Sequence, residues 1–313
     1  MRTFRIPFQA MACANEVVLA ALDEATALHW AGLAVGEVQR IEFKYSRYRP
    51  DSIVSRINAA AGHAEMLSCD DETLSLLEHA QTLYAHSDGL FDISSGVLRR
   101  VWDFKAARRP SPAELAAVLP LIDWPHIERR DGAVRLPRAG MEIDFGGFGK
   151  EYAADRAAAL LQQHGAAHGY VNLAGDLRLL GARPDGSPWH IGIQHPRRRG
   201  ELVASLPLTQ GGLATSGDYE RYFELDGQRY CHVLDPRSGQ PVRHWQSVSV
   251  LAPMAVMAGS CATITMLKQE RGLEFLAAAG VSYLAIDHRG EVHMKSVAQP
   301  ELEPVARASA ITV

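Results

Sequence analysis

The stretch that decides the fold is Glu142–Tyr152, which reads EIDFGGFGKEY. Its apolar and acidic start is typical of a strand, and its glycines predict a loop that leads into a helix from Lys150 to about Gly165. Such a loop presents backbone N–H groups and the positive end of a helix to a phosphate, and Lys150 adds a cation. The stretch is neither the dinucleotide motif GxGxxG nor the phosphate loop GxxxxGK[ST]. Glycines in this arrangement also occur simply for packing.

Outward from this stretch, the hydrophobic pattern alternates between helical and strand periods. Helices are predicted at 14–38, 72–86 and 255–267, the second capped by Asp70 or Asp71. Strands are predicted at 170–173, 189–193, 222–225, 230–234, 248–252, 281–286 and 291–294. Strands in hairpins with interleaved helices indicate an α+β fold with mostly antiparallel sheets. We expect one domain over 1–296 and a loosely attached tail at 297–313.

Composition excludes several classes of function. The 313 residues are 47% hydrophobic and 22% charged, with a formal net charge of -4, so no basic field attracts nucleic acid or an anionic membrane. The four cysteines are scattered, without the spacing of a disulfide framework or a metal finger. The N-terminus offers no clean signal peptide, and no segment reaches the roughly 20 apolar residues of a spanning helix. We therefore expect a cytoplasmic protein with reduced thiols.

Two further segments carry more aromatic and polar side chains than structure alone requires. Residues 45–58 read YSRYRPDSIVSRIN and suit a stacked ring with phosphate or amide groups, although a surface turn capped by Asp51 or Ser52 explains them equally well. Residues 87–96 read SDGLFDISSG. Their glycines allow close approach of the backbone to a ligand, or simply build turns after a helix.

A third segment begins with ATSGDYERY at 214–222 and ends with HVLDPRSG at 232–239. Thr215 and Ser216 offer hydroxyls to phosphate oxygens, and His232 stands where an imidazole serves as a base. A lone histidine at a strand is more often a core group, but the nearby Asp235 favours a functional role.

Together these segments resemble the ApbE-type flavin transferase family, and they occur in the family's order. The matching motifs are S-x-Y-x-x-D-S and S-R-I-N at 46–58, D-G-x-x-D-x-[ST]-x-G at 88–96, D-[LF]-G-G-x-x-K-G-Y-A-x-D at 144–155 but for one position, V-N-x-[GA]-G-D at 171–176, A-T-S-G-[DS]-Y at 214–219, H-x-[IL]-D-P-x-[ST]-G at 232–239, and the strand 247–253 before the family's metal helix. The resemblance implies an ApbE-like fold with a flavin cleft between its halves.

The activity that the resemblance implies is FAD:protein FMN transfer, in which Mg2+ assists the movement of FMN from FAD to a Thr or Ser hydroxyl of an acceptor protein and AMP is released. Thr215 and Ser216 are candidate FAD contacts from their hydroxyls. The resemblance implies further FAD contacts at Met11, Tyr48, Leu90, Phe91, Asp92, Asp144, Lys150 and Leu234. It implies metal ligands at the Gly147 carbonyl and at Thr263, and a base at His232. The alternatives are a flavin-binding protein or FAD hydrolase that modifies no protein, and a protein that uses the fold for another ligand.

Four positions depart from the family pattern. Ala12 and Glu151 stand where the family has glycine, Cys13 stands where it has threonine, and Gly259 replaces an aspartate four residues before Thr263 on the same helical face. Because Mg2+ prefers carboxylates, we expect Gly259 to weaken the metal site or to move the ion to another carboxylate, Asp92, Asp144 or Asp235. If the position is vacant, Gly259→Asp is expected to raise activity at low Mg2+.

Overall fold

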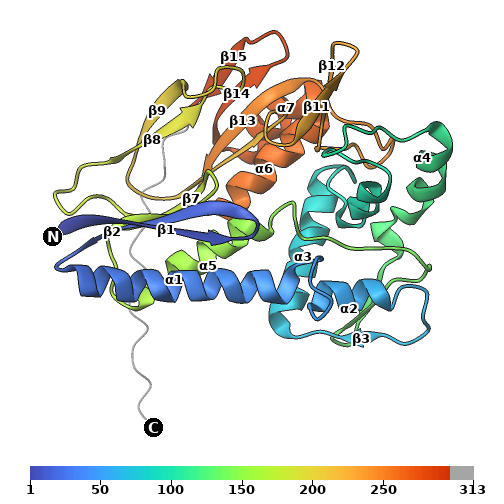
Figure 1. Cartoon of the computed structure of the whole chain (residues 1–313), viewed down its shortest axis with the longest axis horizontal. Helices are drawn as coiled ribbons and strands as arrows, with labels where there is room; N and C mark the ends of the chain where they lie inside the picture. The colour runs from blue at the N-terminus through green and yellow to red at the C-terminus, as the bar shows by residue number, and fades with distance from the viewer. Residues whose placement is uncertain (297–313) are drawn as a thin grey trace.

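The structure, a computed structural model, describes residues 1–296, and the predicted tail at 297–313 lies outside the described residues. Its centre is an eight-stranded sheet in which every neighbouring pair of strands runs antiparallel (Figure 1). In spatial order the strands are β1 (Arg2–Ala10), β2 (Cys13–Ala21), β6 (Gly169–Leu173), β7 (Asp176–Gly181), β10 (Gly212–Gly217), β13 (Trp245–Ala252), β14 (Ser282–Asp287) and β15 (Val292–Lys295). The predicted antiparallel α+β architecture is confirmed.

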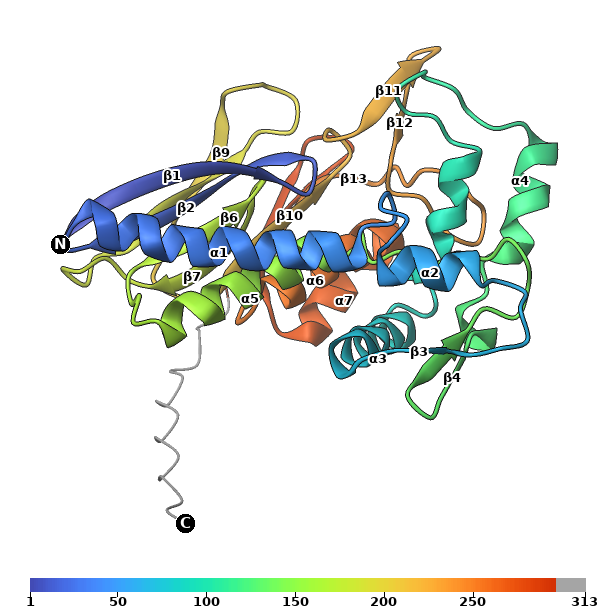
Figure 2. The ribbon, with the colours of Figure 1, turned by 60° about the horizontal axis from the view of Figure 1, so that its bottom comes forward.

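Both faces of this sheet are covered. On one face α1 (Glu24–Tyr45) lies along β1 and β2, α5 (Gly149–Gln163) along β6 and β7, and α6 (Ala255–Lys268) along β10 and β13 (Figure 2). The short α7 (Gly272–Ala279) follows η4 (Gln269–Arg271) and packs on α6. On the other face, the hairpin of β8 (Trp189–Gln194) and β9 (Leu202–Leu208) buries Trp189 against Tyr170. No helix within residues 1–296 is long and apolar enough to cross a membrane.

Residues 46–148 form a second lobe beside the end of α1 (Figures 1 and 2). Ser52 and Asp70 accept hydrogen bonds from the first turns of the first two helices, as capping preferences predict. The same hydrophobic core that contains Val248 of the central sheet includes Leu77 and Trp124 of this lobe. The elements of the lobe are α2 (Ile53–Ala59), β3 (Leu67–Ser68), α3 (Asp71–His86), η1 (Ile93–Arg100), α4 (Pro112–Val118), η2 (Leu119–Leu121), η3 (Trp124–His126), β4 (Glu128–Arg130) and β5 (Ala133–Arg135).

A two-stranded hairpin of β11 (Tyr222–Leu225) and β12 (Gln228–Cys231) bridges from the central sheet to the second lobe. Phe223 and Tyr230 stack with a ring-centroid distance of 5.1 Å, and both rings contact Trp102. The hairpin therefore holds the segment after Cys231 beside the second lobe.

The predicted helix at 14–38 is wrong in its first part. Strand β2 occupies Cys13–Ala21, and α1 begins only at Glu24, where the Asp23 carboxylate accepts a hydrogen bond from Thr26 N at 2.8 Å. The residues from Val17 to Ala21 are all buried. A strand that is covered on both faces shows no alternation of apolar and polar residues, so its sequence resembles a continuation of the helix.

Candidate active site

The glycine-rich loop connects the second lobe to α5. Residues 142–145 form no strand in the structure, which corrects the predicted strand. The side chain of Asn58 holds this segment instead, because its Nδ2 donates to Ile143 O at 3.0 Å and its Oδ1 accepts from Ile143 N at 2.7 Å. Helix α5 begins at Gly149, and no side chain caps its N-terminus by a hydrogen bond. The positive end of the helix therefore faces the loop.

Asp144 and Tyr48 both form hydrogen bonds with the Arg47 side chain. The Arg47 guanidinium donates to Asp144 Oδ2 and, at 3.0 Å, to the Tyr48 hydroxyl. It also lies 5.0 Å from the centre of the Tyr48 ring, whose residue is 75% exposed. The exposed ring offers a face for stacking. Sequence reasoning missed Arg47, because it falls at a variable position of the S-x-Y motif.

Lys150 is the centre of the charged part of the site. Its Nζ lies 2.7 Å from Asp176 Oδ2, and the buried Asp176 accepts a second hydrogen bond from Thr215 N at 3.2 Å. Burial opposes the charge of Lys150, but Asp176 and then Glu151 raise its pKa, so the side chain remains a cation. The charge of Lys150 also contributes to the lowered pKa of His232, after burial and the charge of Arg221.

The predicted phosphate-binding hydroxyls lie on β10 and bond to neighbouring elements. Ser216 Oγ is 2.9 Å from Thr263 Oγ1 of α6, and Thr215 Oγ1 is 2.8 Å from Ser249 Oγ of β13. The structure thus brings Ser216 and the predicted metal ligand Thr263 into direct contact. Both side chains are only partly buried.

His232 follows β12 directly. Its backbone N–H donates to Arg221 O at 3.0 Å, and among residues 1–296 nothing forms a hydrogen bond with its buried Nδ1. Burial, followed by the charge of Arg221, lowers the pKa of His232 to about 4. The imidazole is therefore neutral at physiological pH and is able to accept a proton.

Phe91 and Asp92 point into the protein. The Asp92 carboxylate accepts hydrogen bonds from Ser94 N at 2.7 Å and from Trp124 N at 3.4 Å, so it caps η1. Phe91 packs on Gly147, where an added Cβ would lie 2.8 Å from the ring. The Asp92 carboxylate is thus occupied within the fold, while Gly147 is required for packing.

Leu90, Leu234 and Asp235 lie in the loops around these groups. Both leucines are partly buried against hydrophobic clusters. The Asp235 carboxylate accepts from Arg237 N at 2.7 Å and from Ser238 N at 3.3 Å, which fixes a local turn.

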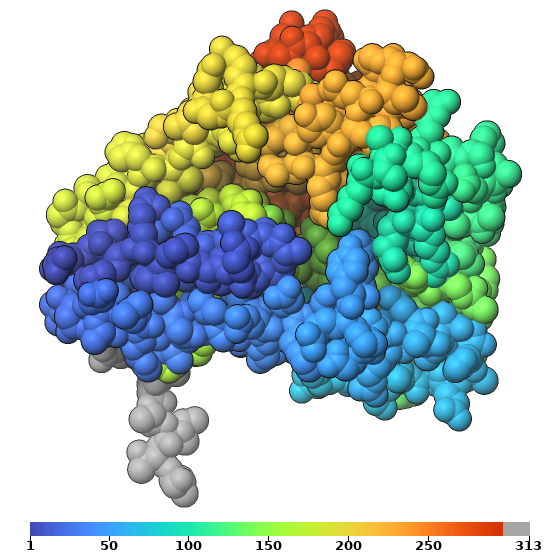
Figure 3. All heavy atoms as spheres, viewed as in Figure 1, coloured from blue at the N-terminus to red at the C-terminus, as the bar shows by residue number. Residues whose placement is uncertain are grey.

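Met11 and Ala12 form the two-residue turn between β1 and β2. Their φ angles are 53° and 59°, a left-handed conformation that is unfavourable for an alanine by about 1–2 kcal/mol. The family's glycine at position 12 would avoid this strain. In Figure 3 the surface is hollowed where this blue hairpin faces the orange and green-cyan segments. The hollow agrees with the expected position of the flavin cleft.

The space beside Gly259 is filled, which corrects the expectation of a vacancy. A Cβ at this position would lie 2.3 Å from Glu151 Oε1 and 2.6 Å from Glu151 Cγ. Glu151 is 7% exposed, and burial, followed by the charge of Asp176, raises its pKa to about 8. The expectation that Gly259→Asp raises activity stays a prediction, and it requires the Glu151 side chain to move away from position 259.

Asp155 is a residue of the loop-to-helix motif whose role sequence reasoning missed. Its two carboxylate oxygens accept from Ala255 N at 2.9 Å and from Val256 N at 2.8 Å, and Arg178 Nε lies 3.3 Å away. Asp155 thus caps α6 from α5. The capping fixes the position of α6, and with it Thr263, relative to the glycine-rich loop.

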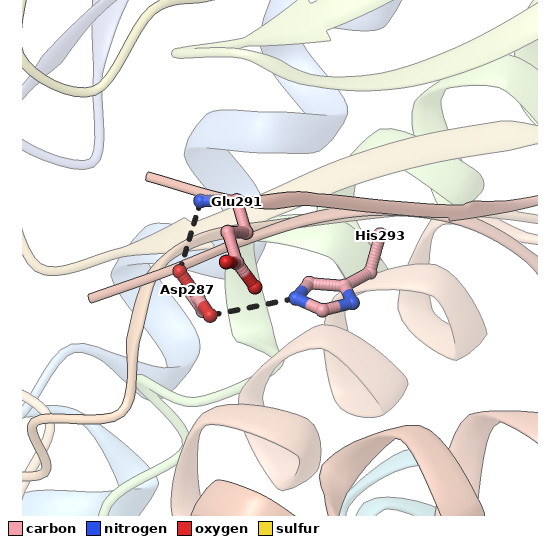
Figure 4. Close-up of side chains that lie close together, drawn as sticks. All are labelled: Asp287, Glu291 and His293. Atoms are coloured by element: carbon pink, nitrogen blue, oxygen red, sulfur yellow. Dashed lines mark hydrogen bonds and ion pairs between the residues drawn. The ribbon is translucent and has the colours of Figure 1, made fainter. Parts of the chain in front are cut away.

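Two other features lie away from these residues. A cavity of about 550 Å³ between α3 and the β4–β5 hairpin contains none of the predicted site residues. Asp287, Glu291 and His293 gather at the β14–β15 hairpin, with His293 Nε2 3.5 Å from Asp287 Oδ2 (Figure 4). There Asp287 Oδ1 accepts from Arg289 N and Glu291 N, both at 2.9 Å, so the hairpin turn itself accounts for the position of this carboxylate.

Comparisons with known proteins agree in sequence and in structure. Residues 11–285 match the ApbE family. The FAD:protein FMN transferase of Salmonella typhimurium is 32% identical over 260 residues, which are 79% of this chain and 73% of that protein. The FAD:protein FMN transferase of Treponema pallidum is 33% identical over 245 residues, which are 72% of this chain and 67% of that protein.

Solved structures of ApbE proteins are also similar to this chain. The ApbE protein of Thermotoga maritima superposes with a TM-score of 0.86 at 29% identity and covers 94% of this chain and 97% of its own. The apo form of the Pseudomonas stutzeri flavinyl transferase ApbE has a TM-score of 0.80 at 30% identity and covers 95% of each chain. The motif order, the antiparallel fold and these matches together show that this chain belongs to the ApbE family.

Proposed function

We propose that this chain is an FAD:protein FMN transferase, which moves FMN from FAD to a Thr or Ser hydroxyl of an acceptor protein, releases AMP and uses Mg2+. The observation that carries the proposal is the Lys150 ammonium at the start of α5, directly after the glycine-rich loop and 2.7 Å from the buried Asp176. The names of the Salmonella and Treponema relatives support the same activity.

The chemistry requires positioning and charge compensation more than covalent catalysis. In the proposed reaction the acceptor hydroxyl oxygen attacks the phosphorus of the FMN half, the bond to the AMP half breaks, and His232 takes the hydroxyl proton. Lys150 and the positive end of α5 compensate the charge of the diphosphate. The exposed ring of Tyr48 provides a stacking face for a ring of FAD.

The donor atoms present suit a divalent cation. Thr263 Oγ1 and the carboxylate of Glu151, which lies against the same face of α6, are oxygen ligands of the kind that Mg2+ prefers. The Gly147 carbonyl is the further ligand that we propose. When bound, Mg2+ would neutralise negative charge on the phosphates.

We further propose that the reaction takes place in the cytoplasm. The four cysteines are all free thiols, and Cys231 and Cys261 are buried. Free thiols of this kind are usual in a reducing compartment.

The decisive test is incubation of the purified protein with FAD, Mg2+ and a peptide that carries a single Thr or Ser. Mass spectrometry should show an FMN increment on the hydroxyl residue, and chromatography should show an equal amount of AMP. The matched control is His232→Gln, which should bind FAD in calorimetry but leave the peptide unmodified. Release of FMN and AMP without peptide modification would support the FAD hydrolase, and binding of FAD without release of AMP would support the flavin-binding protein.

A further inference from the structure

Two departures from the family pattern meet in space between α5 and α6. Glu151 stands in the first turn of α5, where the family has glycine, and Gly259 stands on α6, where the family has aspartate. The Oε1 atom of Glu151 lies only 2.3 Å from the place of a Cβ at residue 259. A carboxylate therefore occupies this space, but it belongs to α5 and not to α6.

The register of the two helices explains the meeting. Glu151 and Asp155 are one turn apart on the same face of α5, and Ala255 and Gly259 are one turn apart on the same face of α6. Because the Asp155 carboxylate binds Ala255 N, the preceding turn of α5 brings Glu151 against the following turn of α6. Residue 259 can hold no side chain there unless Glu151 moves.

The charged groups around Glu151 favour a cation bound at its carboxyl group. Glu151 and Asp176 are both at least nine-tenths buried, and Lys150 is the cation paired with Asp176. Lys150 is thus engaged by Asp176, and a divalent ion held by the Glu151 carboxyl group would be the partner that a buried carboxylate requires. Thr263 lies one turn after Gly259 on the same face of α6, and its hydroxyl is a second oxygen donor on this face.

We propose that Glu151 supplies the carboxylate ligand of the divalent cation in this chain, in place of the aspartate that Gly259 has lost, and that Gly259 is glycine because Glu151 needs its space. The inference rests on the proposed function, since it concerns the cation of the same site. It differs from the transfer of the ion to Asp92, Asp144 or Asp235. Those three carboxylates are bound by local N–H groups or by Arg47.

The test is a titration with Mn2+, followed by the electron paramagnetic resonance signal of the free ion, on protein with and without saturating FAD. Calorimetry on the same samples measures FAD affinity. Glu151→Gln keeps the size of the side chain and should weaken Mn2+ binding at least about tenfold while FAD affinity changes little. Glu291→Gln, at the exposed carboxylate of the β14–β15 hairpin, is the matched control and should bind Mn2+ like the parent protein.

A cycle of variants keeps the test independent of folding defects. Gly259→Asp alone should weaken Mn2+ binding and lower the melting temperature, because the new side chain overlaps Glu151. Glu151→Gly alone should weaken Mn2+ binding by the same factor as Glu151→Gln. The double variant Glu151→Gly/Gly259→Asp should recover Mn2+ affinity to within about threefold of the parent, because one carboxylate is again available to the cation.

The possible results test the role of Glu151 separately from the proposed function. Parent-like Mn2+ affinity in Glu151→Gln, loss of affinity in Glu291→Gln, or no recovery in the double variant would overturn the role of Glu151 while FAD binding and transfer stand. Absence of FAD binding in the parent protein would overturn the proposed function and this inference together.

Discussion

Removal of the Asp155 carboxylate should destabilise the protein strongly, because this residue of α5 caps the neighbouring helix α6. Asp155→Ala leaves Ala255 N and Val256 N without their acceptor and removes the ion pair with Arg178. An unsatisfied buried donor costs about 1–3 kcal/mol, and loss of an N-cap about 0.5–2 kcal/mol. We therefore expect the free energy of unfolding to fall by about 3 kcal/mol. With an entropy of unfolding of about 2.1 cal/mol/K per residue, this loss corresponds to about 5 °C in melting temperature.

The assay is urea denaturation followed by circular dichroism, together with a thermal scan. Asp185→Ala is the control, because Asp185 also accepts a backbone N–H, that of Ser187 at 3.0 Å, but in an exposed turn. The control should change stability by less than about 1 kcal/mol. Equal effects of the two substitutions would refute the reasoning, since they would show that burial of the capped helix end adds nothing.

Three further predictions concern other parts of the chain. Gly32→Ala and Gly36→Ala should each raise the free energy of unfolding by about 0.8–1 kcal/mol in urea titrations, because an added Cβ meets no neighbouring atom within 4 Å; unchanged midpoints would contradict this. Ala12→Gly should stabilise by about 1 kcal/mol by the same measurement, because it relieves a left-handed alanine; a lower midpoint would show that the turn is not strained. With Mg2+ at saturation, the kcat/KM of transfer should stay level from pH 8 to about pH 5 and fall near pH 4, where His232 becomes charged. A fall centred near 6.5 would instead indicate an ordinary imidazole.

The sequence predicts the parts of the fold in which local pattern and structure agree. Asp70 caps α3 as predicted, and α5 and α6 lie within two residues of their predicted bounds. The predictions from the sequence do not include strand β1, although Phe4, Ile6 and Phe8 alternate with polar residues or proline. The sequence pattern predicts helix over strand β2 because the apolar run of this strand is continuous.

The site was predictable as a set of motifs, but not as a set of contacts. The motifs name Lys150 and His232, yet the ion pair of Arg47 with Asp144 depends on how the second lobe folds back on the loop. The overlap of Glu151 with position 259 depends on the register between two helices that are far apart in the chain. Such pairings follow from tertiary packing, which no local pattern specifies.

The geometry of the site depends on the number of residues in helix α1, and less on which residues the helix contains. It runs for 22 residues from the edge of the central sheet to Tyr45, directly before Arg47 and Tyr48. One residue inserted in the helix would turn everything after it by about 100° and advance it by about 1.5 Å. The Arg47 guanidinium would then leave Asp144, whereas many substitutions on the exposed face of α1 would leave it in place. We therefore expect evolution to conserve the residue count of α1 more strictly than its residue types, with insertions and deletions confined to the loops of the second lobe.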